Sequence, residues 1–306
     1  MITNKLKLFV KELIGKSIAI NNNVKTFTKN KLYIFSFHEI TDNPSFFQKR
    51  NHLFVTKKVF KKQLDYINRL FKIIQPSDLL LNTNIKNSAL ITFDDGYVNS
   101  FKYGLKIMTK SKITPIFFLN MSAVKNKTPL LPASLEYLEA HYNKYDHFID
   151  EFNLNKPISL SIKPPQFQKF EKYIKLNKKK INSYQGKIIS LDYLFKKQSH
   201  CNFYIADHLY EHYNCLSLTQ KELIHLCKKN LKILKKFKNH INIFSFPNGV
   251  PGKCFNKKNV NWIKNLNYKK VLSNGNTANP DNIKFLLDRI SLNNNNNTFN
   301  KFLFKI

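Results

Sequence analysis

Short apolar runs of strand length alternate along this chain with longer stretches in which apolar residues recur at the period of a helix. Strands that alternate with helices over such a length favour a mainly parallel sheet, either open or closed into a (β/α) barrel. The sequence therefore predicts an α/β fold. The expected strands are Leu32–Phe37, Ala89–Phe93, Thr114–Leu119, Asn202–Ala206, Ile241–Phe246, Lys269–Leu272 and Phe285–Ile290.

Two of the predicted helices carry start signals. Thr56 and Thr219 stand just before periodic stretches, where a side-chain oxygen can cap the first free backbone N–H groups. Glu222 follows Thr219 by three residues, which is the spacing of a capping box. The four expected helices cover about 57–71, 98–111, 219–238 and 256–266.

One long segment interrupts the alternation. Residues 125–200 are rich in Lys, Tyr and Phe and show no clear strand–helix rhythm, so we expect a mostly helical insertion over one face of the barrel. The barrel with its insertion then spans 31–292, preceded by a basic amphipathic segment at 1–30. Residues 293–306 contain a run of Asn, which is typical of a flexible linker.

The N-terminal segment bears on where the protein works. Its apolar residues could form one face of a basic helix, and we expect that face to pack on its own domain, with docking to an anionic membrane as the alternative. The segment lacks the uninterrupted apolar core of a secretion signal, and no apolar run in the chain approaches the length that spans a bilayer. We therefore expect a cytoplasmic protein, with peripheral contact at the inner membrane face left open. The face would contain Leu6, Leu8, Phe9, Leu13 and Ile14.

The chain is strongly basic. Lys and Arg number 51 against 19 Asp and Glu, a formal net charge of +32, but only Arg50, Arg69 and Arg289 are arginines. Arginine is the residue that recognition of guanine and phosphate favours, and abundant Lys, Asn, Ile and Phe are what an AT-rich genome encodes. We interpret the charge as compositional drift and expect no nucleic-acid partner. A lysine-rich nucleic-acid binder, with patches at Lys178–Lys180 and Lys235–Lys238, is the weakest alternative.

Cysteine spacing indicates neither a disulfide framework nor a structural metal site. The four cysteines form no C-x-x-C motif, so we expect reduced thiols that serve mostly as packing residues. They are Cys201, Cys215, Cys227 and Cys254.

Four of the predicted strands end in polar residues that can do chemistry. The C-terminal ends of parallel strands form the active-site rim of α/β barrels, so these four junctions would converge there. An Asp-Asp-Gly sequence alone is more often a turn, but four such junctions carry more weight than one. They are His38-Glu39, Asp94-Asp95-Gly96, Asp207-His208 and Pro247-Asn248-Gly249.

A histidine pair provides the candidate metal site. His208 and His212 are four residues apart, which places both imidazoles on one face of a helix or lets them converge on a tight loop. Imidazole nitrogens with a nearby carboxylate suit a divalent metal. Two His and one Asp would leave coordination positions open for water and substrate, which is the catalytic pattern.

The motifs together resemble those of the polysaccharide deacetylases, the NodB-homology carbohydrate esterases of family 4. ALITFDDGYVNSF, with the helix and strand after it, resembles their first motif, HLYEH the second, and FSFPNG the third. FSFHEI and LLDRISL resemble the opening and a late strand of the branch with permuted motif order. The resemblance covers about 30–125 and 200–292 and implies a distorted TIM-like (β/α) barrel with the insertion described above.

The resemblance also implies an activity and its residues. The activity would be metal-dependent hydrolysis of N-acetyl groups from an amino-sugar-containing glycan or glycan precursor. The metal would be a divalent ion, usually zinc in this family. The implied metal ligands are Asp95, His208 and His212. The implied base is Asp94, the acid His38, and the backbone donor to the oxyanion lies in the turn Phe246, Pro247, Asn248.

Three departures from the family pattern leave a rival interpretation open. Leu209 stands where the second motif usually has Ser or Thr, and Ser245 where an Arg often orients the base. Arg289 is a candidate substitute for that Arg, and a surface or salt-bridge role is equally open. A usual Leu-x-His near the C-terminus is missing, which makes His38 necessary as the acid. The alternative is a catalytically degenerate barrel that binds glycan without hydrolysing it.

Overall fold

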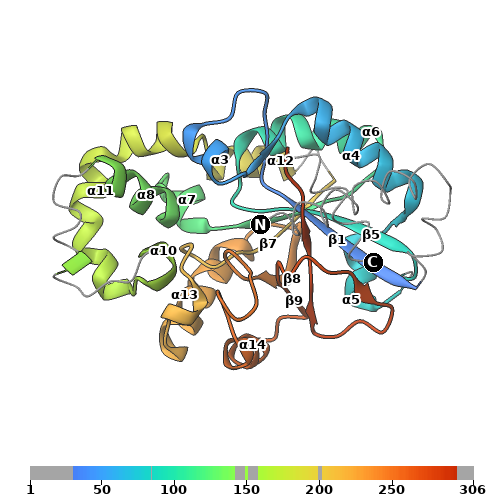
Figure 1. The fold of residues 1–306 in the computed structure, drawn as a ribbon. Coiled ribbons are helices and arrows are strands. Elements are labelled where there is room, and N and C mark those ends of the chain that lie inside the picture. The colour runs from blue at the N-terminus through green and yellow to red at the C-terminus, as the bar shows by residue number, and fades with distance from the viewer. Residues whose placement is uncertain (1–29, 84, 142–148, 151–157, 199–201, 295–306) are drawn as a thin grey trace, which may run out of the picture.

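The fold is taken from a computed structural model, and six of the predicted strands lie in it as parallel neighbours in one sheet (Figure 1). Each begins and ends within two residues of its predicted bounds. The described residues are 30–83, 85–141, 149–150, 158–198 and 202–294. The strands, in order across the sheet, are β1 (Lys31–Phe37), β5 (Ser88–Phe93), β6 (Ile116–Leu119), β7 (Tyr204–Asp207), β8 (His240–Ser245) and β9 (Lys270–Leu272).

The seventh predicted strand, Phe285–Ile290, is divided into two short strands. β11 (Leu286–Leu287) pairs with β9, and β12 (Ile290–Ser291) pairs in parallel with β1. Between them the Asp288 carboxylate accepts a hydrogen bond from the Ser273 hydroxyl (2.8 Å), which anchors a turn away from β9. This crossing nearly closes the sheet into a barrel, so the predicted α/β barrel is confirmed.

Four further strands are only two residues long. β10 (Asn279–Pro280) runs antiparallel to β1, and β4 (Lys72–Ile73) runs parallel to β5. β2 (Glu39–Ile40) and β3 (Phe54–Val55) form a separate parallel pair. Two residues carry no detectable period, so the sequence does not predict these strands.

The predicted helices lie on both sides of the sheet, with α4 and α6 above it and α13 and α14 below it in Figure 1. The Thr56 hydroxyl accepts from the N–H of Val59, and Thr219 and Glu222 form the predicted capping box. The stretch expected as one helix at 98–111 begins with a π-helical turn. The bounds are α4 Lys57–Leu70, the π-helical turn Ser100–Gly104, α6 Leu105–Lys110, α13 Gln220–Leu234 and α14 Lys257–Lys264.

Three short helices were not predicted. α3 (Phe46–Arg50) and α5 (Pro76–Leu81) stand in the connections after β2 and β4. A single 3-10 turn, Cys215–Ser217, precedes α13. Each has at most two turns, too few for an apolar period to be recognised in the sequence.

The segment expected as an insertion is mostly helical in its described part, with short non-helical connections such as 127–130 and 186–190. We call its helices, together with α7 just before them, the cap; α8 packs on both α10 and α11, and α11 also packs on α3. α7, α8, α10 and α11 lie at the left in Figure 1, beside the sheet, and α12 lies near its upper centre. Its helices are α7 (Met121–Asn126), α8 (Leu131–His141), α10 (Ile158–Ser161), α11 (Pro164–Gln185) and α12 (Leu191–Gln198).

Strand residues alternate between the barrel interior and the surrounding helices. In β1, Tyr33 and Phe35 belong to the larger core between the sheet and the helices. Leu32 and Ile34 belong to a separate cluster, to which all six central strands contribute side chains. That second cluster fills the barrel interior, and Leu79 of α5 contributes to it as well. The alternation decides which residues at the strand ends point inward.

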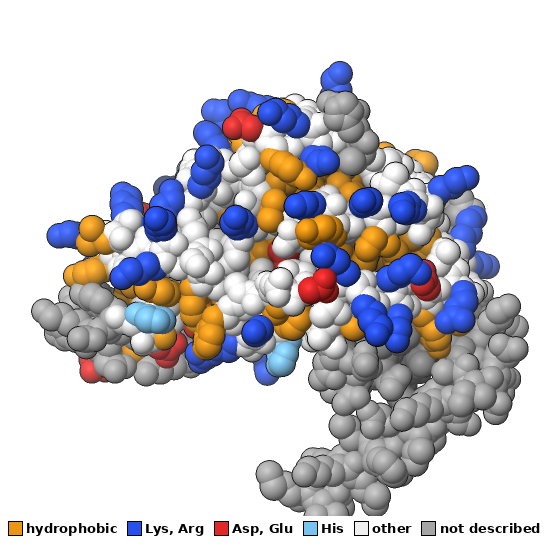
Figure 2. Space-filling view, turned by 90° about the horizontal axis from the view of Figure 1, so that it is seen from above, with side chains coloured by type: hydrophobic (Ala, Val, Ile, Leu, Met, Phe, Trp, Pro, Cys, Tyr) orange, Lys and Arg blue, Asp and Glu red, His pale blue; other side chains and the backbone are white. Residues whose placement is uncertain are grey.

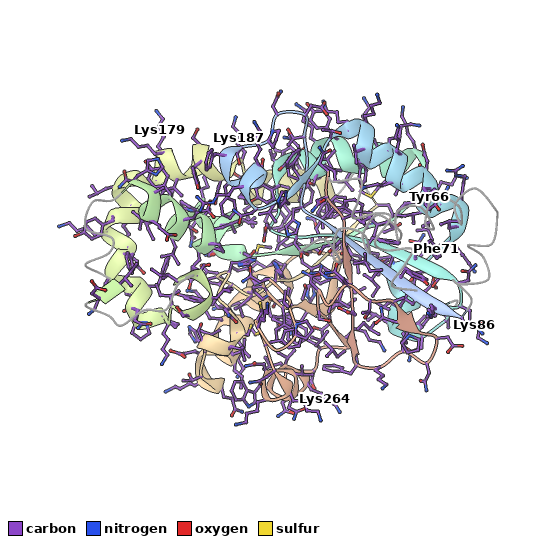
Figure 3. The ribbon with its side chains drawn as sticks, viewed as in Figure 1. Tyr66, Phe71, Lys86, Lys179, Lys187 and Lys264 are labelled. Atoms are coloured by element: carbon purple, nitrogen blue, oxygen red, sulfur yellow. The ribbon has the colours of Figure 1, made fainter. Side chains whose placement is uncertain are left out.

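Lysine covers the outer surface without gathering in one stripe. Figure 2 shows Lys and Arg side chains scattered over the face seen from above, with few Asp or Glu among them. Lys179, Lys187 and Lys264 project outward from opposite sides of the molecule (Figure 3). The charge is therefore spread over the described surface.

Several sequence expectations concern regions or properties away from the barrel. The N-terminal segment, the end of the Asn-rich tail and Cys201 lie outside the described residues. Cys215, Cys227 and Cys254 are buried free thiols, as predicted. Among the helices that the structure describes, none is long and apolar enough to cross a membrane.

Candidate active site

Along the strands every second side chain points into the barrel, and this alternation continues for one residue past three strand ends. The three polar side chains at those positions, His38, Asp94 and His208, therefore point toward the same place. Thr92 and Ala206 lie on the interior side of β5 and β7, and Asp94 and His208 follow each of them by two residues. His38 extends the interior side of β1 in the same way. These three residues and the two predicted partners, Asp95 and His212, all line one cavity of about 650 Å³.

Asp94 is bound by Arg289. Both carboxylate oxygens of Asp94 accept a hydrogen bond from the guanidinium, each at 2.7 Å, and Arg289 is completely buried. The guanidinium also donates to the Ser273 carbonyl (3.3 Å) and the Thr92 hydroxyl (3.3 Å). Burial alone would raise the pKa of Asp94, but the charge of Arg289 and the neighbouring His208 hold it well below the usual range.

The pairing excludes a surface position for Arg289, which forms a buried salt bridge with the candidate base. Arg289 lies at the break between β11 and β12, after the third motif in the sequence. The family's usual Arg would stand before the Pro of that motif, at the position of Ser245. Ser245 itself is buried, and its backbone carbonyl accepts a hydrogen bond from the imidazole of His208 (2.9 Å). The base candidate is thus oriented by an arginine from another strand.

A tight turn brings Asp95 into the cavity beside Asp94. Asp95 has φ +66° and Gly96 φ +79°, and the Gly96 N–H donates to the Asp94 carbonyl (2.8 Å). A Cβ at Gly96 would also come within 3.0 Å of the Leu119 side chain, so glycine is required there. The turn leaves Oδ1 of Asp95 buried without a hydrogen-bond partner.

The two histidines face this unpartnered oxygen. Oδ1 of Asp95 lies 3.4 Å from Nε2 of His212 and 3.7 Å from Nε2 of His208. The Ser245 carbonyl can only accept, so Nδ1 of His208 carries the proton and Nε2 presents its lone pair to the cavity. Burial lowers the pKa of each imidazole to about 4, so both are neutral near pH 7.

The three side chains fit a divalent metal. Their ligand atoms lie within 4.8 Å of one another, and all three residues are buried. Ligands about 2.0–2.2 Å from a common tetrahedral ion stand about 3.3–3.6 Å apart, close to the two separations found here. Burial raises the pKa of the Asp95 carboxyl, so its ionised form calls for a positive charge at this point. Neutral imidazoles and one carboxylate are a donor set typical of catalytic zinc.

His38 lies at the wall of the same cavity, half-buried. Its backbone carbonyl accepts a hydrogen bond from the Ser100 hydroxyl, which ties the end of β1 to the π-helical turn. The imidazole is close enough to Asp94 and Asp95 to influence the pKa of both carboxyls. The predicted acid is therefore brought to the same place as the predicted base.

In the turn after β8, only one of the three predicted residues can serve as a backbone donor. The N–H of Phe246 already donates to the Leu272 carbonyl (3.1 Å), and Pro247 has no N–H. Asn248 borders the cavity with φ +59°, and no acceptor within the described chain takes its N–H. The backbone donor expected from this turn is thus narrowed to Asn248, because strand pairing and the proline ring leave Phe246 and Pro247 no free N–H.

The rest of the cavity wall comes from segments that sequence reasoning did not connect to the site. The cap region contributes aliphatic side chains, and four charged residues also line the cavity: Arg50, which forms an ion pair with Glu136 (3.8 Å), Glu139 and Lys253. These residues follow no strand, so no pattern in the sequence marks them. Asn120 was missed although it follows β6 as a fifth polar strand end. The aliphatic residues are Leu130, just before α8, with Pro132, Leu135, Ile158 and Leu160 from the cap helices.

Comparison with known proteins identifies the family and the fold. The sequence matches a family model described as polysaccharide deacetylase over residues 82–271, more than half of the chain. No curated protein matches it. Similar solved structures include the Streptococcus pyogenes deacetylase PplD in complex with acetate, with 14% identity, a TM-score of 0.56, and 90% of this chain and 97% of that chain covered.

Two more solved structures share the fold. IcaB from Ammonifex degensii has 11% identity and a TM-score of 0.57, with 90% of this chain and 98% of that chain covered. A de-N-acetylase from Aggregatibacter actinomycetemcomitans has 12% identity and a TM-score of 0.53, with 89% and 99% covered. Likeness at such identities is a likeness of fold, and the family match rests on the sequence. The nearly closed barrel and the matched motif-bearing segment lead to one conclusion: the chain belongs to the polysaccharide deacetylase family, hydrolases of N-acetyl amide bonds.

Proposed function

We propose that this protein removes acetyl groups from the amino-sugar units of a glycan or glycan precursor in a reaction that depends on a divalent metal, with zinc as the first choice. One observation carries the proposal. Asp94, paired with Arg289, opens into the same cavity as the convergent set Asp95, His208 and His212. Family membership supplies the reaction type, and this geometry supplies the residues.

The metal, when bound by Asp95, His208 and His212, would polarise the acetyl carbonyl and lower the pKa of a water molecule. Asp94 is held ionised by Arg289, so it accepts the proton of the attacking water. Asn248 lines the cavity, and its backbone N–H donates to the carbonyl oxygen as negative charge develops there. His38 protonates the departing amine, and acetate and a free amino sugar leave.

The degenerate-barrel alternative rested on Ser245 and on the missing C-terminal histidine. Arg289 fills the orienting role that Ser245 lacks, and His38 stands at the cavity wall. Both observations support a working enzyme. The sugar substrate itself is identified by the following assay.

The test is acetate release by the purified, zinc-loaded protein from chitooligosaccharides, peptidoglycan fragments and nucleotide sugars. We expect release from at least one of these classes, and we expect Asp94→Asn to abolish it while leaving zinc content unchanged. Asp65→Asn, on the exposed face of α4, is the matched control and should behave like the wild type. Full zinc content without release from any substrate would contradict the enzyme and favour the binding barrel. Undiminished release by Asp94→Asn would contradict the assigned base.

A further inference from the structure

Asp207 is a completely buried carboxylate next to His208 that the reaction outlined above does not use. It ends β7, and within the described chain no Lys, Arg or His forms an ion pair with it. We propose that Asp207 is the positioning residue that fixes His208, and through it the metal-binding loop, in the geometry needed for ligation. This inference rests on the proposed metal-dependent function and deepens it.

Three donors from three different segments hold the Asp207 carboxylate. Oδ2 accepts from the hydroxyl of Tyr268 (2.6 Å), which lies just before β9. Oδ1 accepts from the side-chain amide of Asn230 (2.7 Å) on α13 and from the backbone N–H of Leu209 (2.7 Å). Because the carboxylate is bound to both a helix and a neighbouring strand connection, it cannot move without them.

Asn230 extends this network to the adjacent strand. Its amide also donates to the Leu119 carbonyl (2.9 Å), and its oxygen accepts from the N–H of Met121 (2.9 Å). The end of β6 and the end of β7 are thus joined through one buried side chain. Asp207 is therefore a fixed point from which the chain after β7 departs.

The loop that carries both histidines needs such a fixed point. Residues 208–213 form no helix, so the four-residue spacing of His208 and His212 is not maintained by helical hydrogen bonds. Leu209 instead has φ +66°, a conformation that is unfavourable for leucine and that reverses the chain immediately after His208. The reversal brings the two imidazole rings to a centroid separation of 5.1 Å at nearly right angles.

Side chains hold Leu209 from both ends. Its N–H donates to Asp207 (2.7 Å), and its carbonyl accepts from the amide of Asn120 (3.0 Å), which also donates to the His208 carbonyl. Leu209 has no hydroxyl, although the second motif of the resembling family usually has Ser or Thr here. In this chain Asp207 and Asn120 provide the polar contacts that fix the loop.

The test compares metal binding in three variants of the full chain. We measure zinc affinity by competition with a chelator, and the visible absorption of the cobalt(II)-substituted protein as a report on ligand geometry. Asp207→Ala should weaken zinc binding about 10- to 100-fold and alter the cobalt spectrum. Asp207→Asn should bind zinc like the wild type, because its oxygen still accepts from Leu209 and its amide can donate to Tyr268.

Asn239→Ala is the matched control for a loss of stability. Asn239 donates to the Phe203 carbonyl (2.9 Å) at the opposite end of β7, so its loss loosens the same strand away from the histidines. We expect it to leave zinc affinity and the cobalt spectrum unchanged. If Asp207→Ala does not fold, Tyr268→Phe replaces it and should weaken zinc binding about threefold to tenfold.

Three results would overturn the positioning role. They are unchanged zinc binding in Asp207→Ala (or in Tyr268→Phe where that replaces it), an equal loss in the Asn239→Ala control, and an Asp207→Asn variant as impaired as Asp207→Ala. Each leaves the proposed function standing, because the wild type still binds zinc. A wild-type protein that binds no zinc would instead overturn both.

Discussion

Asp94 stays ionised because the charge of Arg289 outweighs the effect of burial on the pKa of its carboxyl. A buried carboxylate without a partner would take up a proton and could not act as a base at neutral pH. The bidentate contact with Arg289 reverses that tendency and also fixes the plane of the carboxylate. The guanidinium also donates to Ser273, which follows β9, and to Thr92 of β5, and these contacts fix its own position.

The first prediction concerns this pair. Arg289→Lys keeps the charge but loses the forked geometry, so one charge-assisted hydrogen bond, about 1.5–3 kcal/mol, is lost. We expect kcat for acetate release to fall about 10- to 100-fold with little change in KM. Arg289→Ala leaves a buried charge unpaired and should lower the free energy of unfolding by about 3–5 kcal/mol.

Arg69→Lys is the control, because Arg69 is exposed on α4. It should leave both kcat and the free energy of unfolding unchanged. An Arg289→Lys enzyme with wild-type kcat would show that the fork is not needed.

At the scale of elements, the sequence predicted the strands better than their ends or breaks. Apolar runs marked all six central strands, because burial on both faces leaves a continuous signal. The break between β11 and β12 was not predicted, since it depends on Asp288 binding Ser273, a contact fifteen residues distant in sequence. The same break carries Arg289 to Asp94, so the base's partner could be listed from sequence as a candidate but not assigned.

The site residues divide in the same way. His38, Asp94, Asp95, His208 and His212 could be found because each belongs to a motif at a strand end. Which N–H of the third-motif turn is free could not be found, since pairing of Phe246 with Leu272 is a tertiary contact. Asp207 and Asn120 are visible as polar strand ends, but their role depends on the conformation of Leu209.

The second prediction concerns the contact between β2 and the helix after β5. Glu39 is almost fully buried, its carboxylate accepts from the N–H of Asn99 (3.1 Å), and burial raises its pKa to about 8. The folded state thus holds a proton that the unfolded state has released between about pH 4.5 and pH 8. The free energy of unfolding therefore falls as pH rises through this window, by up to about 1.4 kcal/mol per pH unit from this residue.

Glu39→Gln keeps the acceptor for Asn99 and removes the titration. Urea unfolding at several pH values between about 5 and 8 should show a flatter pH dependence for the variant than for the wild type. Because every other titrating group is common to both proteins, the difference between the curves isolates Glu39. Parallel curves would mean that Glu39 does not titrate in this window.

At the scale of the whole molecule, the basic surface and the acidic site are separate features. Lysine is spread over the face seen in Figure 2, whereas the cavity at the strand ends gathers two Asp and three His. The cap places an aliphatic wall opposite that chemistry and so shapes the opening through which a glycan would enter. The net charge of +32 is therefore mainly a property of the outer surface, although Arg50 and Lys253 also line the cavity.

The central claim is that Asp95, His208 and His212 together hold the metal on which acetate release depends. The most direct measurement is a zinc titration of the metal-free protein, followed by zinc content per chain. We expect a single zinc ion per wild-type chain and a higher Tm on binding. His212→Gln should bind zinc at least about 100-fold more weakly, because losing a direct ligand costs no less than losing a residue that only contacts a ligand. His225→Gln, on the exposed face of α13, should bind zinc like the wild type. A wild-type chain that takes up no zinc, or a His212→Gln chain that binds it equally well, would contradict the account.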